Sequence, residues 1–391
     1  MILEQLFIIT AFVGGIMAIL NMVGANLYDT KEIKRQRQLS RHPHARQYRQ
    51  RPLISVIIPV HNDERAIERC LSGLWRGSYR KFEIIVVDGA SQDSTKRIVK
   101  KLMAEQPKRS VRLIARRSPG TGVEAIAASY KKYASGELVL LLNVGDILDK
   151  RALHNAVQHF NAEPDICILR LNHRVISAFS TVGLFQQYQE LVRQRSKKFT
   201  SVSNSDYEGT GAASAATIYR RNVFLDNMSQ PVRQFGNRAV RSYYASDVIA
   251  NTEPLQSFYG LLRQTYRWQL GRLQALRHQR RLFFSRDGGY SNFLTWFGLP
   301  LALCAGITSL FVPLLLSYFI YLAVKLHEPT FFILSWVILS LFLLLSVWGD
   351  EHLKFRQKAV YSAFIPMTYA WFYALSFVQI FVVLRAATSR D

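Results

Sequence analysis

The chain has 391 residues, 49% of them hydrophobic, and its 50 lysines and arginines against 27 aspartates and glutamates give a net charge of +23. This composition excludes a disordered protein and leaves more apolar sequence than one soluble domain needs, with the surplus at the two ends. Basic residues crowd beside these apolar ends, which favours an anionic membrane face over nucleic acid as the partner. Cys70, Cys167 and Cys304 are far apart, which excludes a disulfide framework and indicates a reducing compartment.

The chain begins with a predicted membrane span. Residues 2–27 are apolar apart from a few polar positions, and they exceed the about 20 residues that cross a bilayer. A cleaved signal peptide is the alternative, but the segment lacks a basic start and its apolar core is too long. Eight lysines and arginines follow within residues 28–52. The positive-inside rule therefore predicts that the long middle of the chain faces the cytosol.

From residue 53 the pattern changes to alternating strands and amphipathic helices. Strand–helix–strand repeats with short loops predict a parallel sheet with right-handed crossovers. The strands of the repeats are expected over residues 53–60, 83–87, 111–115 and 138–142. Two more strands are expected after them, at 165–171 and 212–219.

Polar side chains follow two of these strands. Asp88 and Ser91 come after the second strand, and Asn143 to Asp146 come after the fourth. Open α/β sheets bind ligands at the carboxyl ends of their strands, so these positions predict a ligand site. The first strand is followed by neither Gly-x-Gly-x-x-Gly nor a Walker loop, which disfavours dinucleotide and P-loop sites.

Basic helices and apolar blocks make up the rest of the chain. A helix predicted over residues 184–198 ends in four cations, which suit the helix dipole and lipid phosphates equally well. These cations are Arg193, Arg195, Lys197 and Lys198. Another helix is expected near residues 256–281. Apolar blocks that approach spanning length follow at 298–324, 331–348 and 360–384.

Four motifs lie in one order along the chain: ISVIIPVHNDE at 54–64, IIVVDGASQDST at 84–95, LLNVGD at 141–146 and QTYRW at 264–268. With the apolar segments, they resemble the inverting glycosyltransferases of family 2, in particular the membrane-integrated, processive, polysaccharide-synthase-like branch. The resemblance implies an α/β fold, a Rossmann-like nucleotide-diphospho-sugar transferase domain (the family-A glycosyltransferase fold), plus about four transmembrane helices. The expected domains are a transmembrane helix (1–27), a basic cytosolic linker (28–52), a glycosyltransferase-like α/β domain (53–250), an amphipathic interface helix (251–290) and three transmembrane helices (291–391).

The resemblance also implies inverting sugar transfer from a nucleotide-sugar, usually UDP-linked, to a growing polysaccharide or lipid-linked acceptor. Such chemistry uses Mg²⁺ or Mn²⁺ on carboxylates at the leaving diphosphate, and a carboxylate base for the acceptor hydroxyl. The positions matched to nucleotide-sugar binding are Pro59, Asn62, Glu64, Asp88, Ser91, Asn143 and Asp146. The positions matched to acceptor binding are Gln264, Arg267 and Trp268, for which an amphipathic helix lying on the membrane is the alternative.

The sequence departs from the family pattern at the residues of this chemistry. Gly89, Asn143 and Gly145 stand where the family has aspartates, which leaves Asp146 as the remaining metal candidate. Each charge pair at about 4 Å contributes roughly 4 kcal/mol at an effective dielectric near 20, so two lost carboxylates weaken a cation site. The family's acidic pair before QTYRW is also missing, and the catalytic base is unknown. Its candidates by position alone are Asp206, Glu208 and Asp247.

Two hypotheses of different class stay open. The chain is either an active glycosyltransferase, with Mg²⁺ or Mn²⁺ as cofactor or with arginines in its place, or a catalytically inactive subunit. The inactive subunit would need no metal and would bind a partner synthase or a glycan. Nucleic acid is not an expected partner, because no reading helix or RNP-type strand occurs. Both hypotheses place a multi-pass protein in the plasma membrane with its α/β domain in the cytosol.

Overall fold

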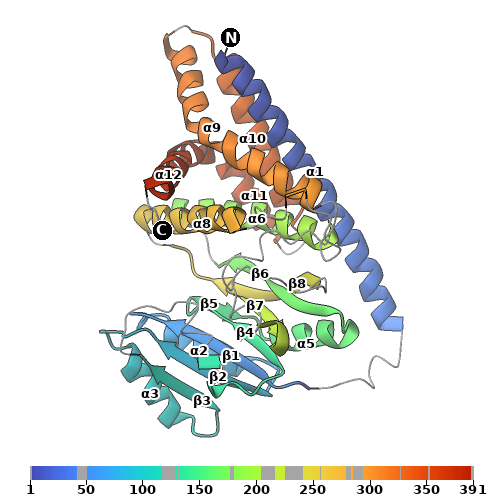
Figure 1. Cartoon of the computed structure of the whole chain (residues 1–391), viewed down its shortest axis with the longest axis vertical. Helices are drawn as coiled ribbons and strands as arrows, with labels where there is room; N and C mark the ends of the chain where they lie inside the picture. The colour runs from blue at the N-terminus through green and yellow to red at the C-terminus, as the bar shows by residue number, and fades with distance from the viewer. Residues whose placement is uncertain are drawn as a thin grey trace. The chain divides into compact units, whose positions relative to one another are not determined.

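The structure is a computed structural model, and the chain divides into two compact units that we describe separately (Figure 1). The α/β unit comprises Thr30–Ile176 and Glu208–Glu253, and the helical unit comprises Met1–Asp29, Ser177–Tyr207 and Pro254–Asp391. The structure describes residues 2–41, 51–116, 129–130, 132–176, 180–203, 216–224, 241–255, 257–278, 283–284, 294–325, 327–350 and 353–388.

The α/β unit is built on a mixed sheet, whose described part has eight strands in the order β3-β2-β1-β4-β7-β6-β8-β5 (Figure 1). Its first half is parallel as predicted, since β1 pairs with β2 and β4, and β2 pairs with β3. In the second half β7 runs antiparallel to β4 and β6, and β5 antiparallel to β8, because the strand–helix–strand repeats end at β4. The strands are β1 (Ile54–Val60), β2 (Phe82–Asp88), β3 (Val111–Ala115), β4 (Leu138–Leu141), β5 (Asp146–Leu148), β6 (Ile166–Val175), β7 (Thr217–Arg220) and β8 (Arg241–Thr252).

Three helices of the α/β unit follow strands along the chain. They are α2 (Ile67–Arg76), α3 (Thr95–Glu105) and α5 (Ala152–Ala162). The last turns of α1 (Ile2–Arg41) also belong to this unit. Two contacts hold them there: the Tyr243 hydroxyl donates to the Glu32 carboxylate, and the Arg35 guanidinium pairs with Glu163 at 2.6 Å. The segment expected as a linker from residue 28 is therefore helical as far as Arg41.

The core of the α/β unit consists of the apolar strands predicted from sequence. All of β4 is buried, as its uninterrupted apolar run predicts for a strand covered on both faces. Tyr130 and Phe224 join this core, and their rings meet edge to face with centroids 4.7 Å apart. Cys70 on α2 is buried as predicted, and burial raises the pKa of its thiol above the usual range. Such a thiol is a core residue and a poor nucleophile.

Within the helical unit, α6 packs against α8, α10 and α12, and α12 also packs against α8 and α9. One face of α6 contacts α10 and the start of α12 through Leu184, Tyr188 and Leu343, and another contacts α8 and α12 through Phe185 and Leu261. Helices α6 and α8 lie side by side (Figure 1). Besides the first part of α1, the elements are α6 (Thr181–Ser203), α8 (Phe258–His278), η3 (Leu294–Gly298), α9 (Leu299–Lys325), α10 (Thr330–Trp348), α11 (Phe355–Phe364), η4 (Ile365–Met367) and α12 (Thr368–Thr388).

The cations at the end of α6 have partners within the protein. Arg193 and Lys197 pair with Glu190 at 3.1 and 3.6 Å, and Lys198 pairs with Asp29 of α1 at 2.6 Å. Arg195 donates to the carbonyl oxygen of Leu345 in the last turn of α10. Contact with lipid phosphates is therefore not required to account for these four residues.

Two apolar stretches of the described residues are long enough to cross a membrane. They are Thr330–Trp348, which is α10, and Phe355–Val382, which runs through α11, η4 and α12. A shorter apolar helix covers Leu310–Lys325 within α9. These stretches coincide with three of the blocks predicted from sequence, and the count of four spans remains a prediction.

Candidate functional site

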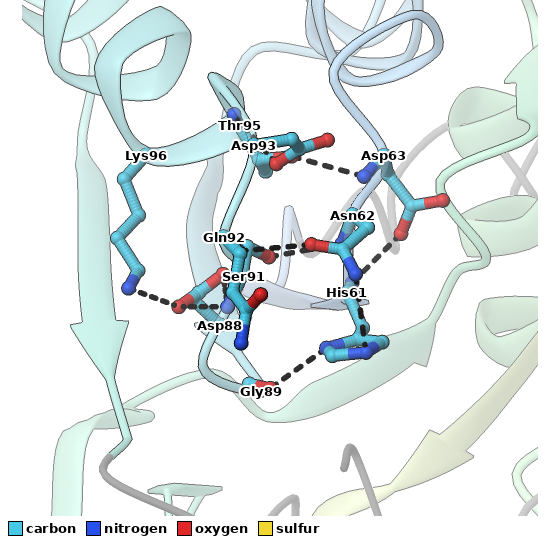
Figure 2. Close-up of polar contacts among 10 residues, drawn as sticks. All are labelled: His61, Asn62, Asp63, Asp88, Gly89, Ser91, Gln92, Asp93, Thr95 and Lys96. Atoms are coloured by element: carbon cyan, nitrogen blue, oxygen red, sulfur yellow. Dashed lines mark hydrogen bonds and ion pairs between the residues drawn. The ribbon is translucent and has the colours of Figure 1, made fainter. Parts of the chain in front are cut away.

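Two loops at the carboxyl ends of β1 and β2 hold most of the residues predicted to bind a nucleotide-sugar (Figure 2). Residues 61–66 join β1 to α2, and residues 89–94 join β2 to α3. The two strands are parallel neighbours in the sheet, so their following loops meet at the same edge. Ligands bind at this edge in open α/β sheets.

Asp88 holds the second loop together from inside the fold. Its side chain is 0% exposed, and its carboxylate accepts the backbone N–H of Ser91 at 3.2 and 3.3 Å. The ammonium group of Lys96, in the first turn of α3, pairs with the same carboxylate at 3.3 Å (Figure 2). A buried carboxylate needs such a partner because desolvation disfavours its charge. Asp88 therefore shapes the loop, and its ligand-binding role remains a prediction.

Hydrogen bonds connect the two loops to each other. The Asn62 N–H donates to the Ser91 hydroxyl at 3.0 Å, and the Gln92 N–H donates to Asn62 Oδ1 at 2.9 Å. His61 Nδ1 lies 2.8 Å from the Gly89 carbonyl oxygen, which only accepts, so Nδ1 carries the proton (Figure 2). The backbone takes the left-handed conformation at Asn62 (φ 57°) and at Ala90 (φ 60°), which turns each loop sharply. Side chains of His61, Asn62 and Gln92 remain exposed at this edge.

A second set of contacts ties the start of α3 to the first loop. Asp93 Oδ1 accepts the Thr95 N–H at 3.0 Å and the Thr95 hydroxyl at 2.6 Å, and these bonds lower the pKa of Asp93 although burial opposes the shift. The N–H groups of Asp63 and Glu64 reach Thr95 and Asp93, and Glu64 accepts the Ser94 N–H at 3.0 Å. Burial and the charge of Asp93 raise the pKa of Asp63. The predicted ligand-binding carboxylate Glu64 is thus engaged between the loops.

The predicted site residues that follow β4, Asn143 and Asp146, differ in how far they are exposed. Asn143 is exposed, and a Cβ added at Gly145 would meet nothing within 4 Å. Asp146 is 2% exposed and starts β5, where Thr252 donates to its Oδ1 at 2.5 Å and His173 Nδ1 lies at 3.6 Å. Pro59 lies within β1, opposite Val87 of β2.

The carboxylates that the structure describes leave few free oxygens for a divalent cation. Mg²⁺ takes six oxygen ligands and Ca²⁺ six to eight, and the described residues contain no group of three His, Cys, Asp or Glu side chains that could hold a metal. Asp88 is paired with Lys96, and Asp146 Oδ2 is the one oxygen of the two carboxylates that is buried without a partner among described atoms. A metal held by Asp146 would depend on water and on the substrate diphosphate for most of its ligands.

The described structure does not bring the candidates for the catalytic base together at this edge of the sheet. Asp247 lies in β8 at a register shift of the β6–β8 pair, and its Oδ1 meets His159 Nε2 of α5 at 2.7 Å. Although burial opposes the shift, the hydrogen bond and charge of His159 lower the pKa of Asp247. Asp206 and Glu208 lie outside the described residues. The role of each as a base stays a prediction.

The predicted acceptor-binding residues all lie in α8 of the helical unit. Gln264 is half-buried, and its Oε1 has no partner among the described atoms. Of Arg267 and Trp268 the structure describes the helical backbone.

Sequence reasoning missed Lys96 and His61 as parts of this edge. A lysine in the first turn of a helix opposes the helix dipole, and this unfavourable position is a signal that an anionic partner lies nearby. His61 carries no such signal, because its contact with Gly89 arises only from the pairing of β1 with β2.

Comparison with known sequences agrees with this fold. Residues 55–226 match the family described as Glycosyl transferase family 2. A Campylobacter jejuni protein named GalNAc(5)-diNAcBac-PP-undecaprenol beta-1,3-glucosyltransferase is 22% identical over 305 residues, which covers 72% of this chain and 92% of the relative. Several matches are to much longer proteins. The chain spans only 15% of a chondroitin synthase from Pasteurella multocida, which is 23% identical over 145 residues and 37% of this chain.

A solved structure has a similar fold. A mannosyltransferase from Pyrobaculum calidifontis, in complex with GDP-Man and Mn²⁺, superposes with a TM-score of 0.54 at 14% identity, and covers 98% of this chain and 100% of its own. At this identity the likeness shows the fold alone, which is the mixed α/β fold of the family-A glycosyltransferases. Residues 55–226 of the chain are therefore a domain of the Glycosyl transferase family 2 type.

Proposed function

We propose that this chain is a membrane-integrated glycosyltransferase that binds a nucleotide-sugar of the UDP-linked class at the carboxyl ends of β1, β2 and β4. The observation that carries the proposal is the pair of hydrogen-bonded loops at residues 61–66 and 89–94. They present exposed polar groups on a rigid base, which is what orientation of a nucleotide requires. The acceptor is a growing polysaccharide or a lipid-linked sugar, and the name of the Campylobacter relative supports the lipid-linked class.

Inverting transfer breaks one bond and forms another at the anomeric carbon of the sugar. The acceptor hydroxyl attacks this carbon, the nucleoside diphosphate leaves with the bonding electrons, and a base takes the hydroxyl proton. In this proposal His61, Asn62 and Gln92 orient the nucleotide, and Asp88 and Lys96 keep the loop in shape. Asp206, Glu208 and Asp247 remain the candidates for the base.

Donor binding in this proposal does not depend on a divalent cation. Two family aspartates are Asn143 and Gly145 here, and the described carboxylates Asp88 and Asp146 are engaged with protein groups. The diphosphate charge would instead be balanced by cationic side chains, of which the chain has a large excess.

Calorimetry on the purified full-length chain tests this proposal. We expect binding of UDP and of UDP-sugars, with an affinity that changes less than about twofold between Mg²⁺ and EDTA. His61→Ala and Asp88→Ala should each weaken binding about tenfold or more, because the loops that orient the nucleotide lose one or two of their hydrogen bonds. Glu105→Ala, at the exposed end of α3, is the matched control. Binding that requires Mg²⁺, or that survives both site variants, contradicts the proposal.

A catalytically inactive subunit is the second candidate. It is favoured because the carboxylates of Asp88 and Asp146 already have partners within the protein. Such a subunit would keep the nucleotide-binding loops and bind a partner synthase or a glycan. Release of UDP from a UDP-sugar separates the candidates. Turnover by the wild-type chain that is lost in Asp88→Ala establishes the enzyme, and binding without turnover in the presence of acceptor lipids establishes the inactive subunit.

The remaining predictions concern the membrane and the acceptor. We infer a multi-pass protein of the plasma membrane with residues 53–250 in the cytosol, supported by the two spanning-length stretches of the described residues. Gln264, Arg267 and Trp268 of α8 are proposed to contact the acceptor. A Trp268→Ala variant that keeps full binding of the acceptor would favour the alternative, a helix lying on the membrane.

A further inference from the structure

The strand β3 lies at one end of the described sheet. It pairs with β2 on one side, and no strand among the described residues pairs with its other side (Figure 1). Unpaired sheet edges present backbone donors and acceptors with which another chain can pair. The charges around β3 decide which kind of partner such an edge admits.

The hydrogen bonds between β2 and β3 show which backbone groups of β3 point outward. The Ile84 N–H donates to the Ser110 carbonyl oxygen at 2.8 Å, and the Arg116 N–H donates to the Asp88 carbonyl oxygen at 3.0 Å. A strand in a parallel pair bonds its neighbour through alternate residues. The even-numbered residues of β3 therefore turn their backbone groups toward β2.

The odd-numbered residues of β3 turn their backbone groups to the outer side. The N–H and C=O groups of Leu113 and Ala115 have no hydrogen-bond partner within the described ranges of the chain. The Val111 carbonyl oxygen points the same way, whereas the Val111 N–H donates to the Arg109 carbonyl oxygen at 3.0 Å. This edge thus offers alternating donors and acceptors, which an added strand would match.

Cations are concentrated around this edge. Residues 95–116, which form α3, the following turn and β3, contain eight lysines and arginines and one acidic residue, Glu105. Two of the eight have carboxylate partners, since Lys96 pairs with Asp88 and Lys101 pairs with Glu105 at 3.7 Å. The other six form no ion pair with any carboxylate that the structure describes: Arg97, Lys100, Lys108, Arg109, Arg112 and Arg116.

We propose that the outer side of β3 binds an extended acidic segment of a partner protein, which adds a strand to the sheet. The backbone of this segment pairs with Leu113 and Ala115, and its carboxylates meet the cations of residues 97–116. The inference does not rest on the proposed function, because it uses backbone groups and cations that the proposed donor site does not use.

Other occupants fit this edge less well. A second copy of this chain would bring two sets of cations together, and the chain has no run of more than two acidic residues to offset them. The phosphates of nucleic acid or of anionic lipid only accept hydrogen bonds, so they would leave the outward carbonyl oxygens of β3 without donors. An acidic polypeptide supplies donors, acceptors and negative charge together.

Fluorescence anisotropy on the purified full-length chain, at physiological ionic strength, tests the proposal. The probe is a labelled, acetylated peptide of four Glu-Val repeats, whose alternating pattern suits an added strand. One control peptide has the same sequence with every backbone nitrogen methylated, and another has lysine in place of glutamate. We expect the Glu-Val peptide to bind at least about tenfold more tightly than either control, because only it has both carboxylates and backbone donors.

Two variants locate the contacts, each with a matched control. Leu113→Pro removes an outward N–H without removing a bond to β2 and should weaken binding about tenfold, whereas Leu113→Val keeps the N–H and should stay within about twofold. Neutralising the Lys-Arg pair before β3, with Lys108→Gln and Arg109→Gln, should weaken binding about fivefold or more. The same change in the exposed pair Lys150 and Arg151, which follows β5 at the other end of the described sheet, should have little effect.

Hydrogen exchange measured by mass spectrometry should show slower exchange in residues 111–116 when the Glu-Val peptide is bound. The proposal is overturned if no peptide binds, as expected of cations that only keep sheet edges apart, or if the methylated peptide binds as tightly. It is also overturned if a DNA oligonucleotide or phosphatidylglycerol vesicles displace the probe more effectively than unlabelled peptide, since the surface would then bind polyanions in general. The comparison of the peptides on the wild-type chain decides the matter even if Leu113→Pro fails to fold.

Discussion

Gly136 and Gly145 flank β4, and their surroundings differ at the scale of single atoms. A Cβ added at Gly136 would lie 2.6 Å from both the N and the Oγ of Ser55 in β1. One added at Gly145 would meet nothing within 4 Å. The backbone at Gly136 therefore approaches β1 as closely as only glycine allows, whereas Gly145 is open.

This contrast predicts the effect of one added methyl group at each site. Gly136→Ala should lower the free energy of unfolding by about 1–3 kcal/mol, because backbone atoms of β1 must move to make room. Gly145→Ala should change it by less than about 0.5 kcal/mol. Chemical unfolding of the full-length chain, followed by circular dichroism, measures both. Equal effects of the two substitutions would refute the close approach of Gly136 to β1.

The site residues show how far single positions can be interpreted from sequence. The motifs placed Asn62, Asp88 and Ser91 correctly at one sheet edge, because the ends of neighbouring parallel strands meet there. The exposure of these residues was not predictable. Asp88 is buried because Lys96 is close enough to compensate its charge.

At the scale of elements, a buried glutamate ties three strands together at the edge opposite the site. Glu83 of β2 accepts hydrogen bonds from the Ser55 hydroxyl of β1 at 2.7 Å and from the Ser135 N–H before β4 at 2.7 Å. The Ser55 oxygen in turn accepts the Gly136 N–H at 2.9 Å. Although burial alone would raise the pKa of Glu83, these donors lower it.

A lowered pKa in the folded state makes stability depend on pH. The unfolded glutamate has a pKa of about 4.3, so the stabilisation is complete above that value and is lost as pH falls through the lower folded pKa. We expect the free energy of unfolding to decrease more between pH 5.5 and 3.5 in the wild type than in Glu83→Gln. The exposed Glu105→Gln serves as the control and should follow the wild type. The same pH dependence in Glu83→Gln and wild type would refute this assignment.

Helix α6 is the other element whose role depended on its neighbours. Its basic end predicted equally a helix-dipole effect and lipid contact, and the structure supplies Glu190, Asp29 and the end of α10 as partners. The amphipathic pattern alone could not identify these partners, because two of them lie on helices distant in sequence.

At the scale of the whole molecule, the predicted topology places residues 325–330 outside the cell and residues 349–359 in the cytosol. The second loop carries Lys354 and Lys358, and basic loops stay in the cytosol. Of single cysteines introduced into a cysteine-free chain, Glu328→Cys should react with a membrane-impermeant maleimide in intact cells. Lys354→Cys should react only after permeabilisation. Labelling of both positions in intact cells would contradict the predicted topology.

The sequence by itself determined the parallel half of the sheet, the loops at its carboxyl edge and the family. Apolar runs and turn motifs are local properties, so the strands β1 to β4 and their parallel pairing could be predicted from them. Only the tertiary structure decided which carboxylates have a partner within the protein. Asp146 pairs with Thr252, 106 residues away, and Asp247 pairs with His159, 88 residues away. Such contacts depend on packing in space, which no local pattern encodes.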